Sequence, residues 1–190
     1  MGENRLRFCT ALGTDPEELR YGRQMHGPVV RRAEGRGEPG DGLWTDARGE
    51  PLLVFTADCL PVALARTDGE QPAIAALHVG WRGLLGGIVQ GAAAALGPAP
   101  LAAVIGPGIG PCCYEVDDDV AQPFRERFGD GIVSGRHLDL WSAAEQALRA
   151  VGVTTVFRFD LCTACNSELF FSHRRDGGRT GRQGLIAYVT

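Results

Sequence analysis

The sequence predicts a single α/β domain of the mixed α+β kind, built around a mixed sheet. A length of 190 residues suffices for one compact domain, so residues 1–190 are treated as one unit. The composition, 44% hydrophobic and 22% charged, is that of a globular protein with a sizeable core. Short apolar runs flanked by glycine alternate irregularly with helical patterns, which favours a mixed sheet over regular βαβ repeats.

The predicted elements follow one another along the chain with short connections. Residues 33–42 are rich in glycine and charge and indicate an exposed loop. Apolar runs predict strands at 51–56, 60–65, 73–79, 101–105, 153–159 and 184–189. Helical patterns predict one helix from about residue 81 to 96, ended by a Gly-Pro pair, and further helices at 117–128 and 139–150. Asp139 is the expected N-cap of the last helix.

Charge and hydropathy exclude several classes of function. The net charge of −4 and the pI of about 5.6 argue against a general nucleic-acid binder. The apolar stretches fall short of the roughly 18 to 20 residues that span a bilayer. The N-terminus lacks the apolar segment of a secretory signal, so we expect a cytoplasmic protein with no membrane partner.

Two histidines and one cysteine are the strongest candidates for a chemical site. His26 lies in Gln-Met-His-Gly, Cys59 follows Thr-Ala-Asp, and His78 begins His-Val-Gly-Trp-Arg-Gly. Cys59 follows the predicted strand at 51–56, and His78 lies at the end of the one at 73–79. Open sheets place ligand sites at strand ends, so the two side chains share one edge if these strands are neighbours.

Two imidazoles and one thiolate form a donor set that suits Zn²⁺. Three protein ligands leave a fourth position for water, whose pKa the ion lowers toward about 7. Asp58 and Arg82 adjoin the candidate ligands along the chain and could orient them or the water. A metal-free site, with Cys59 as nucleophile and His78 as its base, cannot be separated from this by spacing, although His26 favours the metal because a thiol–imidazole pair needs no second imidazole.

The remaining cysteines form two local pairs. Cys112 and Cys113 are adjacent, a poor arrangement for a closed zinc site, and Cys162 and Cys165 form a Cys-x-x-Cys sequence. Such a sequence can mark a redox pair. Without a second Cys-x-x-Cys or a thioredoxin-like context, we interpret all four as ordinary thiols.

Seven ordered motifs are similar to those of a known family. They are QMHG, GDGLWTD, FTADCLPV, LHVGWRGLLGGI, IGPGIGPCCYEV, LDLW and LCT…FFSHRRDGGRTGR, between about Gln24 and Val189. Together they resemble the bacterial multicopper polyphenol oxidase (laccase-domain) family, also described as purine nucleoside phosphorylases. The resemblance implies a three-layer mixed α/β fold, shared with the cysteine-dependent bacterial deamidase toxins. It also places the family's metal ligands on His26, Cys59 and His78.

The resemblance implies chemistry on purine nucleosides. It implies phosphorolysis of adenosine, inosine, guanosine and methylthioadenosine to free base and ribose 1-phosphate, together with adenosine deamination. Zn²⁺ is the expected cofactor, and copper is the one that the family label suggests. Phosphate requires cations or backbone amides. Arg174, Arg175 and Arg82 are the candidate cations, and Gly108 in the loop 106–110 is a candidate backbone donor, although a structural turn and solvated arginines are the simpler alternatives.

The chain departs from the family pattern at three points. Val79 replaces the usual alanine after the motif histidine, and Ala144 stands where asparagine is common. Asn4-Arg5-Leu6 resembles the stretch that follows the family's F-T-T-R-x-G-G segment. The family's N-terminal strands are therefore expected to be missing or shortened within residues 1–190.

Four functions stay open from the sequence. They are a zinc-dependent purine nucleoside enzyme, a copper-dependent polyphenol oxidase, a metal-free Cys–His hydrolase, and a non-enzymatic scaffold with a vestigial site. Four histidines are few for a laccase with several coppers, which argues against the second. The expected partners are purine nucleosides and phosphate, without nucleic acid, and the state is either a monomer or a homodimer.

Overall fold

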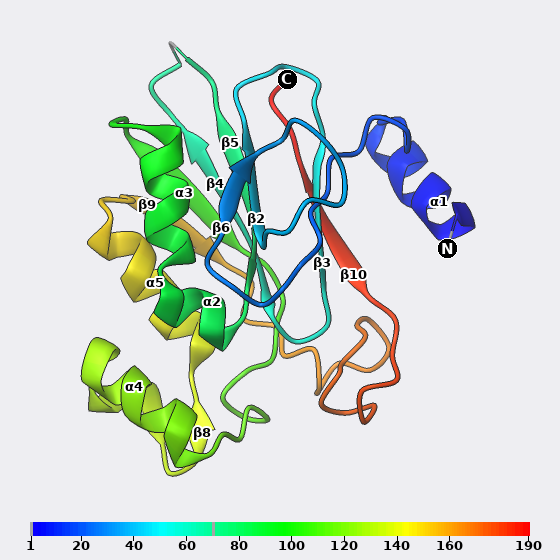
Figure 1. Ribbon diagram of the computed structural model, residues 1–190. Helices are drawn as coiled ribbons and strands as arrows, with labels where there is room; N and C mark the ends of the chain where they lie inside the picture. Colours follow the sequence, from blue (N-terminus) through cyan, green and yellow to red (C-terminus); the bar gives the residue numbers. More distant parts are fainter. Residues whose placement is uncertain (1, 70) are drawn as a thin grey trace.

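A six-stranded mixed sheet forms the centre of the computed structural model, which describes residues 2–69 and 71–190 (Figure 1). In spatial order its strands are β1 (Val30–Arg32), β2 (Gly42–Thr45), β5 (Ile74–Val79), β4 (Leu60–Arg66), β6 (Leu101–Ile105) and β9 (Thr155–Arg158). The outer pairs β1–β2 and β6–β9 are parallel, and the three inner pairs are antiparallel. The predicted mixed sheet is therefore confirmed.

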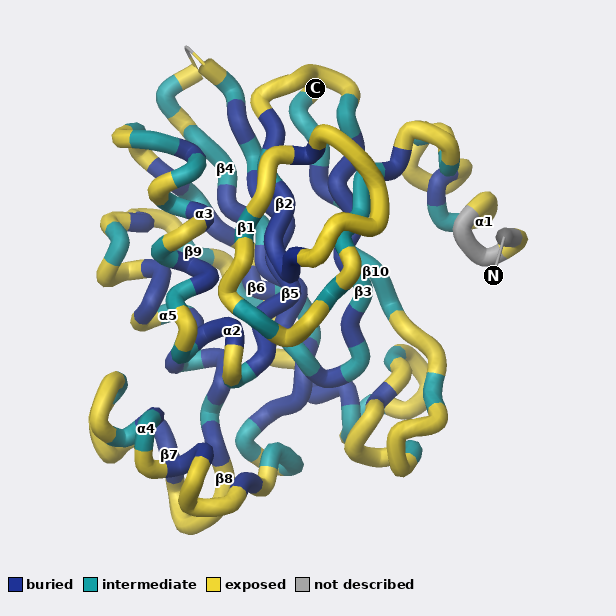
Figure 2. The backbone as a smooth tube through the Cα atoms, viewed as in Figure 1, coloured by how far each residue is buried: buried dark blue, intermediate teal, exposed yellow. Residues whose placement is uncertain are grey.

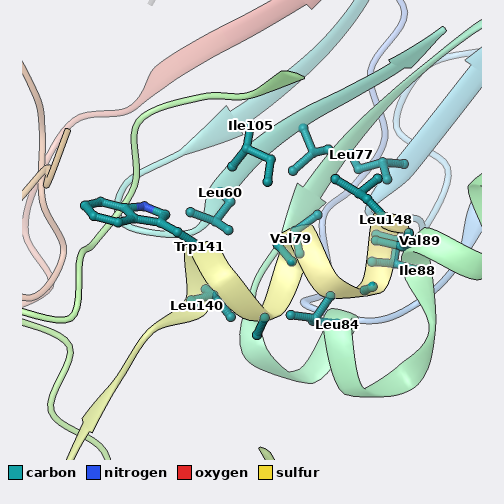
Figure 3. Close-up of a cluster of buried hydrophobic side chains, with 14 of the residues drawn as sticks. Leu60, Leu77, Val79, Leu84, Ile88, Val89, Ile105, Leu140, Trp141 and Leu148 are labelled. Atoms are coloured by element: carbon teal, nitrogen blue, oxygen red, sulfur yellow. The ribbon is translucent and has the colours of Figure 1, made fainter. Parts of the chain in front are cut away.

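Helices cover one face of this sheet (Figure 1). They are α2 (Trp81–Gly86), α3 (Ile88–Leu96) and α5 (Leu140–Ala150). Their apolar sides form the main core with the central strands, and Figure 3 shows Leu60, Leu77 and Val79 facing helix side chains such as Leu84, Ile88 and Leu148. Full burial of such a side chain stabilises the fold by roughly 1.5–3 kcal/mol.

A second, two-stranded sheet covers the opposite face. Strand β3 (Leu52–Thr56) pairs antiparallel with β10 (Gln183–Ala187), the last strand of the chain. This pair packs on β5 and β4 through a smaller apolar cluster. Helix α1 (Gly2–Leu12) lies on its outer side, where the buried Cys9 contacts Leu19 and Leu53 (Figures 1 and 2). The result is the predicted three-layer arrangement, with α1 added outside it.

A small segment, residues 118–138, lies below the helical layer in Figure 1. It consists of α4 (Asp118–Phe128), the 3₁₀ turn η1 (Asp130–Ile132) and the short antiparallel pair β7 (Val133–Ser134) and β8 (His137–Leu138). Figure 2 shows that much of this segment is exposed. Phe124, on α4, is nevertheless fully buried in the main core. The segment is thus part of the same folded unit.

The structure differs from the sequence prediction at several elements. The helix expected from 81 to 96 is two helices, because Gly87 adopts a left-handed conformation with φ of 92° and interrupts it. Gly42 begins strand β2 inside the segment predicted as loop. Helix α1 and strands β1, β7 and β8 have no predicted counterpart. Within residues 2–69 and 71–190, every helix is too short or too polar to span a lipid bilayer.

Candidate metal centre

The ladder between β4 and β5 brings Cys59 and His78 together. These strands run antiparallel, with Leu60 opposite Val79 and Pro61 opposite His78. The start of β4 therefore lies beside the end of β5, and Cys59 immediately precedes β4. The neighbouring strands considered from the sequence, 51–56 and 73–79, belong to different sheets, because β3 pairs with β10. The two side chains share one edge for a different reason from the one the sequence suggested.

The segment that carries His26 is attached to β3 by the preceding glutamine. Gln24 Nε2 donates to the carbonyl oxygen of Phe55 at 2.7 Å, and the Phe55 amide donates to Gln24 Oε1 at 2.8 Å. The side chain thus satisfies both backbone groups of a residue in β3. His26 itself has a φ of 58°, a left-handed conformation that a side chain of this size rarely adopts.

Asp41 contacts the imidazole of His78 and the backbone of the segment that carries His26. Its buried carboxylate accepts the amides of Met25, His26 and Gly27 at 2.9, 2.8 and 2.9 Å. The same carboxylate lies 2.7 Å from His78 Nδ1, which leaves Nε2 as the ring nitrogen free for another partner. Burial raises the pKa of Asp41, but the hydrogen bonds with His78 and with the amides of Gly27 and Met25 outweigh it and lower the pKa. Such a carboxylate behind a histidine is typical of metal sites.

Sequence analysis did not single out Asp41. It lies in the GDGLWTD motif, directly before β2, but a lone aspartate after a glycine-rich loop carries no spacing signal. Its role becomes visible only when the loop 25–27 and the end of β5 are seen to converge on it.

The three candidate ligands meet at one point. One donor atom each from His26, Cys59 and His78 lies within 4.8 Å of the others, and the two imidazole centroids are 4.8 Å apart in an edge-on arrangement. His78 is buried, Cys59 half-buried and His26 exposed, so the cluster is open on one side. A Cβ at Gly80 would lie 3.1 Å from the Cys59 sulfur, so glycine keeps this point free of side-chain atoms. Three converging donors with one open side are compatible with a bound metal ion that keeps a free coordination position.

Electrostatics favour a thiolate at this point. Burial raises the pKa of Cys59, but hydrogen bonds with His26 and His78 outweigh it and lower the pKa to about 7. Burial lowers the pKa of His78, but its hydrogen bonds with Asp41 and Cys59 raise the pKa to about 9. These shifts favour the thiolate form of Cys59 beside a protonated His78, and a thiolate suits both a metal ligand and a nucleophile.

The lowered pKa leads to a measurable reactivity. In metal-stripped protein, alkylation of Cys59 by iodoacetamide should reach half its maximal rate near pH 7, because the thiolate is the reactive form. Mass spectrometry of the Cys59 peptide across pH measures this rate. An ordinary thiol would have its midpoint at about 8.5, and that result would contradict the described environment.

A cavity of about 1330 Å³ adjoins the three candidate ligands. Its volume suffices for a small molecule of nucleoside size with an anion beside it. Apolar side chains form part of its wall: Phe8, Leu19, Leu53, Phe55, Ile109, Tyr114, Leu140 and Phe171. Basic residues line it as well: the two arginines Arg174 and Arg182, together with His173. Sequence analysis missed His173 and Arg182 as cavity residues, although the motif that contains Arg174 spans both.

Asp58 fixes the loop that carries Arg174 against the turn that carries Cys59. It has a φ of 87°, is buried, and accepts hydrogen bonds from Thr163 Oγ1 at 2.6 Å and from the Arg174 amide at 2.7 Å. Each carboxylate oxygen thus has a partner. Asp58 therefore positions Thr163 and the backbone of Arg174, and the role expected for it toward the candidate ligands or their water stays a prediction.

Arg174 is the arginine that the structure places best for an anion. It lines the cavity, its Nη1 donates to the carbonyl oxygen of Glu115 at 2.8 Å, and its guanidinium lies 5.6 Å from the Tyr114 ring centroid. These contacts leave its other N–H groups available and hold the charge at a fixed place in the wall.

Arg82 and Arg175 differ from their expected positions. Neither is among the side chains that line the cavity. The guanidinium of Arg82 is exposed and stacks on Trp81 at 4.4 Å. That of Arg175 pairs with Asp176 at 2.7 Å and donates to two carbonyl oxygens of its own loop. The prediction that these two arginines hold phosphate is therefore not supported by the geometry.

Gly108 also lies outside the cavity wall, and its role is in packing. A Cβ there would overlap the Leu60 side chain and lie 2.9 Å from the Asp58 carbonyl oxygen. The following amide, of Ile109, already donates to that carbonyl at 2.8 Å. The expected phosphate-binding loop is instead a close-packed turn beside the candidate ligands.

The fold and the site define a mixed α/β protein with a metal-compatible centre of two imidazoles and one thiol, open to a cavity of substrate size. The chain belongs to the multi-copper polyphenol oxidoreductase laccase family, whose family model matches residues 1–190. The family predicted from the motifs is thereby confirmed.

Similar proteins and solved structures agree with this assignment. The chain is 37% identical over 205 residues to a purine nucleoside phosphorylase of Xylella fastidiosa, covering 98% of this chain and 77% of the relative. A purine nucleoside phosphorylase of Deinococcus radiodurans is 39% identical over 197 residues, with coverages of 98% and 76%.

The fold matches two crystal structures closely. The hypothetical protein YfiH of Bacillus licheniformis superposes with a TM-score of 0.91 at 30% identity, covering 99% of this chain and 80% of that one. YlmD of Geobacillus stearothermophilus gives 0.87 at 33% identity, with coverages of 98% and 79%. The predicted fold class is confirmed. The likeness to deamidase toxins and the shortened N-terminal strands stay predictions.

Proposed function

We propose that this chain is a zinc-dependent purine nucleoside phosphorylase that also deaminates adenosine. The observation that carries the proposal is the convergence of His26, Cys59 and His78 at the open cavity. Relatives named purine nucleoside phosphorylase, at 37% and 39% identity, supply the substrate class. Adenosine, inosine, guanosine and methylthioadenosine are the proposed nucleosides. All six cysteines are free, which suits a reducing compartment and hence the cytoplasm.

The residues present fit a zinc ion. Two imidazole nitrogens and one thiolate are donors that Zn²⁺ prefers, and the thiolate character of Cys59 is favoured by both imidazoles. Asp41 fixes His78 through Nδ1, so that Nε2 faces the cluster. When bound, Zn²⁺ supplies a Lewis acid and a positive charge next to the substrate.

The cavity wall offers apolar surface to one part of the substrates and positive charge to another. Phe55, Ile109 and Tyr114 offer apolar surface to the purine and the ribose. Burial and the nearby Cys59 charge raise the pKa of Tyr114, so its hydroxyl stays protonated and can donate a hydrogen bond. Arg174 and Arg182 offer positive charge to phosphate.

Phosphorolysis then needs few protein groups. A phosphate oxygen forms a bond to the anomeric carbon of ribose while the bond to the purine nitrogen breaks. The purine leaves with that electron pair and takes up one proton, which gives the free base and ribose 1-phosphate. The chain's contribution is to hold phosphate at Arg174, shield the reacting bond from water and stabilise charge on the leaving purine.

Removing the Arg174 side chain should weaken phosphate binding selectively. Arg174→Ala should raise the KM for phosphate roughly 10- to 100-fold, the value of one or two charge-assisted hydrogen bonds, while the KM for adenosine changes little. Steady-state kinetics with each substrate varied in turn measures this. Arg179→Ala is the matched control, because this exposed arginine of the same loop lies outside the cavity wall. An equal loss for both substrates would show that Arg174 does not bind phosphate.

The proposed function is tested by product analysis. Zinc-loaded protein incubated with adenosine and phosphate should yield adenine and ribose 1-phosphate. Deamination of adenosine by the same protein should yield inosine and ammonia. Full zinc occupancy without release of base from any purine nucleoside would refute the proposal. Oxygen consumption with phenols by copper-loaded protein would instead support the polyphenol oxidase that the family description names.

A metal-free cysteine hydrolase is the second candidate, favoured by the pKa of Cys59 near 7 and its contact with both imidazoles. Activity that survives complete metal removal and is lost on Cys59 alkylation would support it. Protection of Cys59 from iodoacetamide by Zn²⁺, with activity restored only by the metal, would support the zinc enzyme.

A further inference from the structure

A second group of thiols lies outside the site described above. Cys112 and Cys113 come from the loop between β6 and α4, and Cys162 and Cys165 from the loop after β9. The Cys165 sulfur is 3.5 Å from that of Cys112 and 3.4 Å from that of Cys113. All four sulfur atoms lie within 4.8 Å of one another. The two pairs interpreted as ordinary thiols from the sequence thus form one cluster.

The spacing of the four sulfur atoms matches a tetrahedral metal site. Four thiolates on one zinc ion, with bonds of about 2.3 Å, lie roughly 3.8 Å from one another. The two sulfur–sulfur distances to Cys165 fall slightly below this value, and every other pair lies within 4.8 Å. A disulfide would need about 2.05 Å, and all four cysteines are free. The adjacent pair, which sequence analysis considered poor for a closed site, directs both sulfur atoms to Cys165.

A backbone amide faces one of the four sulfur atoms. The Gly110 amide donates to the buried Cys162 sulfur at 3.3 Å, a contact that favours negative charge on this atom. A divalent cation bound by the four sulfur atoms would displace their thiol protons to solvent.

We propose that Cys112, Cys113, Cys162 and Cys165 bind one Zn²⁺ in a closed, structural site. Four protein thiolates fill the tetrahedral shell and leave no position for substrate. This site is independent of the proposed activity, since it shares no ligand with the centre at His26, Cys59 and His78.

The proposed ion would join two loops that form the cavity wall. Tyr114, which lines the cavity, directly follows Cys113. Thr163, which directly follows Cys162, donates to Asp58 next to the candidate ligand Cys59. Without the ion, Gly108 links these loops through its carbonyl, which accepts the Thr163 amide at 3.1 Å. Zinc at the four-cysteine cluster would therefore stiffen the wall from outside the cavity.

Metal content and Co²⁺ spectra of matched variants test the proposal. Protein expressed with zinc and then dialysed should hold two zinc ions per chain, whereas Cys165→Ser and Cys112→Ser should each hold one. His26→Ala should lose the other ion. Co²⁺-substituted His26→Ala should keep the strong sulfur-to-cobalt charge-transfer bands of a four-thiolate site, and Cys165→Ser should lose most of that intensity. Cys9→Ala is the control, because Cys9 belongs to α1 and packs against Leu19 and Leu53, apart from the cluster.

Stability gives a second measure that does not depend on activity. A chelator strong enough to remove both ions should lower the melting temperature of His26→Ala, which retains the four-cysteine site, but leave that of a folded Cys165→Ser, His26→Ala double variant unchanged. If Cys165→Ser does not fold, Cys112→Ser, at another exposed position of the cluster, replaces it in both measurements.

Three results would overturn the proposal. The first is the same zinc content in wild type and the cluster variants. The second is an intact mass of fresh wild type lower by two hydrogen atoms, with a disulfide from Cys165 to Cys112 or Cys113. The third is alkylation of all four cysteines in zinc-saturated protein. Failure of the nucleoside assay alone would refute the proposed function and leave these measurements unaffected.

Discussion

Replacement of His78 by alanine should remove both the zinc of the cavity centre and nucleoside turnover. His78 is the most buried of the three candidate ligands, and its loss leaves two donors that cannot hold the ion in a tetrahedral site. Turnover should fall roughly a thousandfold or more, because a metal Lewis acid contributes several kcal/mol to such a reaction. Metal analysis and steady-state kinetics on the same preparation measure both effects.

His26→Ala serves as a second test of the metal centre, and His137→Ala serves as the control. His78 contacts Asp41, so its removal also leaves a buried carboxylate without a partner and lowers stability. His26→Ala removes a ligand at the surface of the cluster and should give the same two losses in a folded protein. His137→Ala, at an exposed position on β8, should change neither. If His78→Ala retains both zinc and turnover, the metal assignment is wrong.

The second large effect is expected at Asp41, which touches no substrate. In the wild type, Oδ1 and Oδ2 of Asp41 together accept three backbone amides and face His78. Asp41→Asn replaces one of these two acceptor oxygens by an amide group. The loop that carries His26 should loosen and His78 should lose its fixed orientation. Zinc affinity should fall roughly 10- to 100-fold, as for other carboxylates behind metal-bound histidines.

A zinc titration separates positioning from simple destabilisation. If Asp41 acts through the metal, excess zinc should restore most of the kcat of Asp41→Asn, while its melting temperature stays below that of wild type. Asp46→Asn is the control, because this exposed carboxylate pairs with Arg32 at the surface. Wild-type zinc affinity in a folded Asp41→Asn protein would contradict the role assigned to Asp41.

Local sequence patterns predict those helices and strands whose ends are marked by nearby turn or capping residues. The strand predicted at 101–105 matches β6, because a five-residue apolar run with turn residues on both sides indicates where the strand begins and ends. The helix at 139–150 matches α5 within one residue, and the Asp139 side chain accepts the Ser142 amide at 2.9 Å as the expected N-cap. Residues 51–56 and 184–189 were recognised as strands on the same grounds.

Long-range pairing could not be predicted from these patterns. β3 and β10 are both apolar and short, and only the tertiary fold brings them together in a separate two-stranded sheet. The three-residue strand β1 is too short to show a period of two. The run from Trp81 to Leu96 is helical in composition throughout, so its break at Gly87 depends on a backbone conformation that composition does not specify.

The candidate site divides in the same way. His26, Cys59 and His78 were found because each lies in a distinctive motif, and the structure brings them together. Asp41 and Arg182 were missed because their roles depend on contacts between segments far apart in sequence. The four-cysteine cluster was missed for the same reason, since each half of it has a common local explanation.

Anomalous X-ray diffraction at the zinc edge, on crystals of zinc-loaded protein, tests the central claim most directly. The account predicts an anomalous peak in the cavity within about 2.0–2.3 Å of one nitrogen each of His26 and His78 and of the Cys59 sulfur. In zinc-saturated crystals, the absence of a peak at this position would contradict it, even with zinc bound elsewhere on the chain.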